Sequence, residues 1–243
     1  MARVLAGAFK LPWEQRKPLA RAVFVPLLAV IGVSLIGEFD LIALPETLDW
    51  LWVVIYCVPA AWLAVYIHRF LLRDLSDAHT GAKSGNVKRV VLYGLLGLAF
   101  WALLIGATLF GTRDVPAENS PDIEESMAQM VQTVVILFVS AVISALIGGR
   151  LCLALPAIAV DADVRAAVHA ARGNTLRLTV VFALLPIAMS LLIELLFREN
   201  AGFLDLTLLV VLGAIVMVVE VAALSLSYRE LTQPAPPPTD PPA

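Results

Sequence analysis

Six long apolar runs, separated by short polar loops, make up most of this chain. Each run is roughly 20 residues long, which as a helix crosses the roughly 30 Å of hydrocarbon in a bilayer. None shows the alternation of apolar and polar residues that is typical of a half-buried strand. The pattern predicts an all-α fold, a polytopic membrane bundle whose six transmembrane helices lie at about 19–37, 50–70, 90–111, 127–149, 175–197 and 206–228.

Positive charge is distributed unequally over the loops between these runs. Of the 17 Lys and Arg residues, all except Arg113 and Arg198 lie on one side of the predicted bundle. Short loops rich in Lys and Arg stay in the cytoplasm, so we expect both termini to be cytoplasmic. Charged residues make up only 15% of the chain, whereas an ordinary soluble domain has about 25%. The basic residues are explained by orientation, so we expect membrane lipids and no nucleic acid as partners.

The segments at the two ends differ from the spans. In residues 1–18, Val4, Leu5, Ala8 and Phe9 share one helical face, and Trp13 suits the depth of lipid headgroups. We expect this leader to be a short surface helix broken by Pro12. Residues 233–243 are rich in proline, which predicts a disordered tail after the membrane domain of residues 19–232.

A cytoplasmic amphipathic helix is predicted at Asp161–Gly173. Asp161 or Asp163 can cap its start and Gly173 its end. One face is apolar, and Arg165, His169 and Arg172 line another, where they can contact the headgroups of anionic lipids. The alternative is a connector whose charges only enforce topology.

Small residues recur at four-residue intervals in the fourth span, at Ser140, Ser144 and Gly148. Such spacing lets two membrane helices approach closely. The fourth helix is therefore predicted either to lie centrally in the bundle or to bind a protein partner, including a second copy of the chain.

Polar residues inside the spans are the candidates for chemistry. Glu220 lies near the middle of the last span, where an ionised carboxylate costs several kcal/mol unless it is paired. His68 and Tyr93 lie at comparable depth and are candidate partners, and Gln129 and Gln132 form a polar patch in the fourth span. Glu220 either fixes helix packing or acts as a coupling or substrate-binding group.

Prolines lie near the centres of three predicted spans, at Pro26, Pro59 and Pro186. Each removes a backbone donor and can kink its helix. They are either ordinary features of membrane helices or breaks that open a central site.

Catalytic motifs are mostly absent from the sequence. Gly32-Val-Ser34 is similar to an intramembrane serine nucleophile, which leaves an intramembrane enzyme as a third alternative, but the later spans supply no histidine base. The sequence contains no His-Glu-x-x-His zinc helix and no glycine-rich phosphate loop with its lysine. Asp74, Asp77 and His79 are better explained as a solvated loop than as a metal site. We therefore expect no enzyme, no cofactor and no metal, and a structural, lipid-interacting or scaffolding role. The alternative is a small secondary transporter that uses Glu220 as its coupling carboxylate.

Part of the chain is similar to a known group of membrane proteins. The stretch Arg150-Leu-Cys-Leu-Ala-Leu-Pro156, the Asp161–Ala171 helix and the following Arg172-Gly173-Asn174 resemble the YciC-like bacterial inner-membrane proteins. They also resemble the related membrane domain that is fused to some glycerophosphodiester phosphodiesterases. About 50 residues carry the resemblance by motif. It implies a multi-pass protein of the bacterial cytoplasmic (inner) membrane, but no reaction, because the phosphodiesterase domain has no counterpart in these 243 residues.

Overall fold

A computed structural model describes residues 2–39, 50–72, 86–112, 142–184 and 203–232, with single positions at 135, 138, 139, 188 and 189. Every element in this part of the chain is helical, which confirms the predicted all-α class for it. The elements are α1 (Ala2–Glu14), α2 (Arg16–Glu38), α3 (Trp50–Leu71), α5 (Asn86–Thr112), α7 (Ala154–Ala159), α8 (Val164–Ala171), η3 (Arg172–Asn174), α9 (Thr175–Thr179), the π-helical η4 (Val180–Leu184) and α11 (Phe203–Thr232).

Four helices among the described residues are long and apolar enough to cross a membrane: Arg16–Gly37, Leu51–Leu71, Val142–Ala159 and Asp205–Thr232. Large apolar side chains such as Phe24, Val25 and Leu28 lie exposed on their outer faces, as the surface of a protein dissolved in lipid requires. The chain is therefore a helical membrane protein. The predicted third span falls within α5, a single helix of 27 residues.

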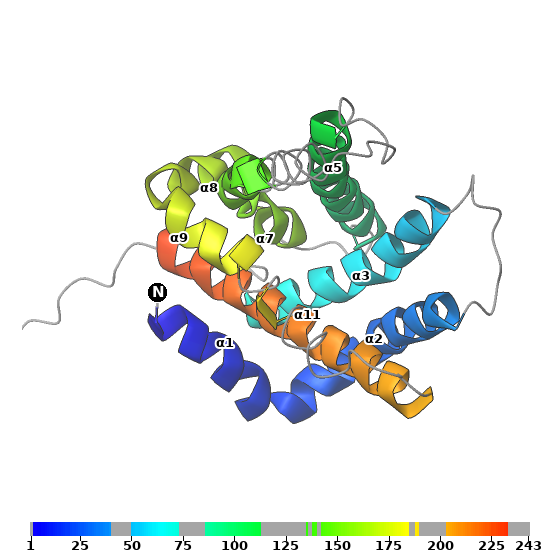
Figure 1. Cartoon of the computed structure of the whole chain (residues 1–243). Helices are drawn as coiled ribbons and strands as arrows, with labels where there is room; N and C mark the ends of the chain where they lie inside the picture. The colour runs from blue at the N-terminus through cyan, green and yellow to red at the C-terminus, as the bar shows by residue number, and fades with distance from the viewer. Residues whose placement is uncertain are drawn as a thin grey trace, which may run out of the picture.

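Helix α3 lies centrally, between α5 on one side and α2 on the other, and it also contacts α11 (Figure 1). Its residues Leu63, Ala64 and Ile67 are fully buried and pack with Val30 of α2 and Val221 of α11. Both α2 and α3 continue through their central prolines, Pro26 and Pro59, as unbroken helices. The predicted Pro186 lies outside the described residues.

The leader differs from its prediction, because Pro12 does not break it. Helix α1 continues to Glu14, and the chain turns at Gln15 before α2 begins. Val4 and Ala8 are buried, and a Cβ atom added at Gly7 would lie 3.0 Å from the Leu226 side chain. One face of α1 therefore packs closely against α11, and this packing maintains the helix although Pro12 has no N–H to donate.

The fourth helix also departs from its predicted bounds. Its described part, Val142–Ala159, continues ten residues past the predicted end at Gly149, through a turn at Cys152–Leu153. Cys152, Leu153 and Ala157 are buried in a core cluster with Ala222 of α11. The predicted span stops before Arg150, which lies exposed, while the residues after it are apolar enough to be buried.

Helix α8 lies within the predicted amphipathic segment. Asp163 is its N-cap, and the Asp163 carboxylate accepts a hydrogen bond from the Arg165 backbone N–H at 2.8 Å. The prediction that Gly173 ends the helix is wrong. Gly173 lies inside the 3₁₀ turn η3 and has no positive φ, so the chain continues directly into α9.

Candidate functional site

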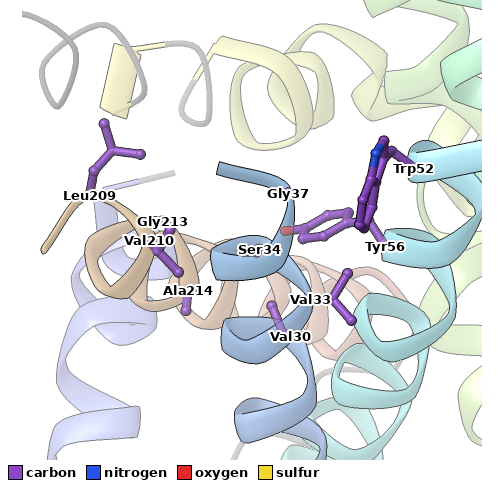
Figure 2. A pocket seen from close by; sticks show the side chains of 10 residues that line it. All are labelled: Val30, Val33, Ser34, Gly37, Trp52, Tyr56, Leu209, Val210, Gly213 and Ala214. Atoms are coloured by element: carbon purple, nitrogen blue, oxygen red, sulfur yellow. The ribbon is translucent and has the colours of Figure 1, made fainter. Parts of the chain in front are cut away.

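A cavity of about 360 Å³ opens between the end of α2, the start of α3 and the start of α11. It is mainly apolar, and its polar atoms come from the Ser34 hydroxyl, the Trp52 indole and the Tyr56 phenol (Figure 2). In Figure 2 the Tyr56 ring reaches from α3 towards Ser34 and Gly37 of α2. The lining residues are Val30, Val33, Ser34, Gly37, Trp52, Tyr56, Leu209, Val210, Gly213 and Ala214.

Small residues create this space. Gly37, Gly213 and Ala214 stand where larger side chains would fill the gap between the helices. A Cβ atom added at Gly213 would meet no atom within 4 Å. The volume falls within the range of about 300–1,000 Å³ that is usual for small-molecule sites. The cavity is therefore large enough to admit a ligand or part of a lipid.

Glu220 lies on the same side of α11 as the cavity. It follows Gly213 by seven residues, two turns of an α-helix, so both residues share one helix face about 10 Å apart along the axis. Its carboxylate lies within electrostatic reach of Tyr56, Tyr93 and Cys152, which belong to three other parts of the bundle. The Glu220 side chain is therefore directed into the bundle.

The Glu220 carboxylate forms no hydrogen bond or ion pair with any residue that the structure describes. The sequence analysis proposed His68 and Tyr93 as its partners. The structure instead joins these two residues to each other and to Ser225 of α11. Glu220 is thus a partly buried acid whose carboxyl group has no polar partner among the described side chains.

The three residues form a buried hydrogen-bonded chain across three helices. His68 Nδ1 lies 2.7 Å from the Ser225 hydroxyl, and His68 Nε2 lies 3.1 Å from the Tyr93 hydroxyl. Ser225 donates its proton to the Val221 carbonyl at 2.8 Å. His68 Nδ1–H therefore donates to Ser225, and Nε2 accepts the Tyr93 hydroxyl proton. This arrangement satisfies a neutral imidazole and connects α3, α5 and α11.

Sequence reasoning missed Ser225 and the polar residues of the cavity. Serine is common in membrane helices, and nothing in the sequence separates Ser225 from Ser227, which is also buried but whose hydroxyl has no partner among the described residues. Trp52 and Tyr56 resemble ordinary aromatic residues near a membrane surface. What sets these residues apart from others of the same type is how the helices are rotated relative to one another, and the sequence does not show this rotation.

The small residues of the fourth helix pack against α9 and η4 of the same chain. A Cβ atom at Gly148 would overlap the Phe182 ring, and one at Gly149 would come within 2.8 Å of the Thr179 backbone nitrogen. Thr179 donates its hydroxyl to the Ala145 carbonyl at 3.3 Å. Ser144 is buried and its hydroxyl has no partner in the part of the chain that the structure describes, while Ser140, Gln129 and Gln132 lie outside that part.

The basic residues of α8 lie on its exposed face. Arg165, His169 and Arg172 are exposed, whereas Ala167 and Ala171 are fully buried against the bundle. Leu176, one turn further on, is 74% exposed. The helix thus packs its apolar face on protein and presents its cations outward, next to an exposed apolar side chain.

An ion pair joins the start of α5 to the turn before α8. The Arg89 guanidinium, which is only 4% exposed, binds the Asp161 carboxylate through two nitrogens, with Nε–H donating at 2.7 Å. This hydrogen bond lowers the pKa of Asp161, an effect that the positive charges of Arg89, Arg69 and Lys88 reinforce. Asp161 has φ of 57°, a left-handed conformation that Asp tolerates better than most residues.

Within the described ranges, no three His, Cys, Asp or Glu side chains gather in a way that could hold a metal ion. The predicted solvated cluster of Asp74, Asp77 and His79 lies outside those ranges. Cys57 and Cys152 are both free. Comparison of the chain with protein-family models, with curated proteins and with solved structures finds no match.

Proposed function

We propose that this membrane protein binds an amphiphile dissolved in the bilayer and acts by holding it, without catalysing a reaction. The cavity between α2, α3 and α11 carries this proposal. Its wall is mainly apolar, with three polar side chains among the lining residues, which is the composition expected of a site that binds an apolar ligand and fixes its orientation.

The proposal includes the topology predicted from charge and the location that the resemblance to the YciC-like proteins implies. Six spans place both termini and the basic face of α8 in the cytoplasm of a bacterium, with the protein in its inner membrane. Arg165, His169 and Arg172 then face anionic headgroups, each at about 1 kcal/mol. Reporter fusions after Arg89 and after Arg113 are expected to report opposite compartments. The same compartment at both positions contradicts this topology.

Filling the cavity tests the binding function. Gly213→Leu places a larger side chain into open space in the cavity, and Gly97→Leu is the matched control, because Gly97 also has open space at its Cβ but does not line the cavity. The full chain, purified in lipid nanodiscs, is analysed by native mass spectrometry. We expect bound amphiphile on the wild type and the control, and about tenfold less on Gly213→Leu, corresponding to about 1.4 kcal/mol. Equal occupancy of all three contradicts the proposal.

A second candidate function is a small secondary transporter. The observation in its favour is the Glu220 carboxylate, which no described residue pairs and which lies within electrostatic reach of the cavity residue Tyr56. Proteoliposomes that contain a pH-sensitive dye test it. Solute-dependent proton movement with the wild type that is lost in Glu220→Gln supports transport, and the same movement with both proteins contradicts it.

A further inference from the structure

We propose that the cavity ligand is a lipophilic organic cation whose charge pairs with the Glu220 carboxylate while its apolar groups occupy the space between α2, α3 and α11. This inference rests on the proposed function, because it names the chemistry of the ligand for that cavity. Three features of the structure lead to it.

The first feature is the unpaired carboxyl group of Glu220, which a cationic partner would hold in its ionised form. A carboxylate at membrane depth is retained only when it is paired or faces a cavity. Among the described residues, the Glu220 carboxylate has neither a hydrogen bond nor an ion pair. A positively charged ligand supplies the missing partner, whereas a carboxylate in this position repels an anionic ligand.

The second feature is the chemistry of the cavity wall. A hydrated inorganic cation needs several oxygen ligands, but the lining side chains offer only the hydroxyls of Ser34 and Tyr56. The aromatic rings of Trp52 and Tyr56 suit an organic cation, because their faces attract positive charge. The apolar remainder of the wall favours a cation whose charge is shielded by hydrocarbon groups.

The third feature is that the cavity and the Glu220 side chain lie on one face of α11. Gly213 lines the cavity, and Glu220 lies on the same face of α11 two turns later. Tyr56 belongs to the cavity wall and also lies within electrostatic reach of Glu220. Between Gly213 and Glu220 stands Met217, a partly buried side chain whose unbranched thioether can change rotamer to admit a ligand.

A pair of ions with the same shape and opposite charge tests this inference. Tetraphenylphosphonium is the cation, tetraphenylborate is the matched anion, and triphenylmethane is a neutral probe. Binding to the full chain in nanodiscs is measured by equilibrium dialysis, with empty nanodiscs as the background. We expect the wild type to bind the cation at least about tenfold more tightly than the anion. If the wild type binds the two ions with equal affinity, the inference is overturned, and this test needs no variant.

Variants at Glu220 then test whether its carboxylate is the group that pairs with the cation. Glu220→Gln is expected to weaken binding of the cation about tenfold and to leave triphenylmethane unaffected, whereas Glu220→Asp keeps the preference for the cation. The control is Glu14→Gln, which removes an exposed carboxylate paired with Lys10 and leaves cation binding unchanged. Unchanged cation affinity in a folded Glu220→Gln protein overturns the inference.

The neutral probe separates this inference from the proposed function. If triphenylmethane binds and Gly213→Leu prevents its binding, but the wild type shows no preference for the cation, the cavity function stands and the cation inference is wrong. If none of the three probes binds above the background of empty nanodiscs, both proposals are wrong.

Discussion

At one end of the bundle, here called the packed end, α3, α5 and α11 meet around His68, Tyr93 and Ser225. At the other, the open end, α2, α3 and α11 leave a cavity beside Tyr56 and Gly213. The same two helices, α3 and α11, contribute to both ends. At the packed end each polar group of the His68 network has a partner, whereas at the open end polar atoms border empty space.

The difference indicates how stability and binding are divided along these helices. His68, Ser225 and the neighbouring apolar residues of α3 and α11 are fully buried at the packed end, while Ile55 and Tyr56 at the open end are partly exposed. Regions with few buried contacts contribute least to global stability and most often bind ligands. The packed end therefore holds the helices together, and the open end remains available for a ligand.

The largest expected effect comes from a close backbone approach beside the packed end, where the fourth helix meets α9. Gly149→Ala puts a methyl group within 2.8 Å of the Thr179 backbone nitrogen, where neither helix has room to move. We expect a loss of about 3 kcal/mol in the free energy of unfolding, the upper part of the range for overpacked cores. Thermal unfolding in nanodiscs measures it. The control is Gly213→Ala at the open end, and equal stability of both variants breaks the comparison.

Removal of His68 is expected to have the next largest effect. His68→Ala leaves a cavity and removes two hydrogen bonds from the network, at a cost of about 2–3 kcal/mol. Tyr93→Phe, which removes one hydrogen bond, is expected to cost about 1 kcal/mol. The same unfolding measurement applies, with Tyr56→Phe at the open end as the matched Tyr→Phe control. A control that loses as much stability as Tyr93→Phe contradicts the division between the two ends.

Acid is expected to lower the free energy of unfolding by less than the substitutions above, because it weakens only the ion pair beside α8. Because Arg89 lowers the pKa of Asp161 below its ordinary value of 3.8, the pair contributes full stability above that pH and loses its contribution as pH falls through the lowered pKa. The side chain of Asp161 is 42% exposed, so we expect only about 1 kcal/mol.

Asp161→Asn tests this pH dependence, because Asn also tolerates the left-handed backbone. Its stability is expected to be about 1 kcal/mol lower at neutral pH and less sensitive to acid between pH 5 and 2, measured as thermal unfolding against pH. If the wild type and Asp161→Asn decline in parallel over this range, the pair does not titrate as described.

The smallest effect on stability is expected at the open end itself. Gly213→Leu enters space that no atom occupies, and Leu favours a helix by up to about 1 kcal/mol over Gly. We expect the free energy of unfolding to stay within about 1 kcal/mol of the wild type while ligand binding falls. A large loss of stability would mean that the open end is packed as tightly as the other end.

Sequence patterns predicted the helices and one helix cap well, because these features depend on residues that are neighbours in the sequence. Apolar runs define the helices that contain the first, second and last spans, and Asp163 caps α8 within the predicted segment. The helix that contains the predicted fourth span continues past Gly149, because the residues after Arg150 are apolar enough to be buried. Pro12 was misjudged because the contact of α1 with α11 is not visible in the local sequence.

The candidate site was only partly predictable. Glu220 is conspicuous because a carboxylate is costly in hydrocarbon. The pairing of His68 with Ser225 links residues 157 positions apart and depends on how α3 and α11 rotate about their axes. Depth along a helix can be counted from the sequence, but rotation cannot, so His68 and Tyr93 were assigned to Glu220 instead of to each other.

The contact between Arg89 and Asp161 has a consequence for how the protein is made. The two residues are 72 positions apart, so the ribosome completes α5 long before it adds the acidic partner. The bidentate contact is consequently a late one, which can form only after the ribosome has synthesised the fourth helix and the turn that follows it.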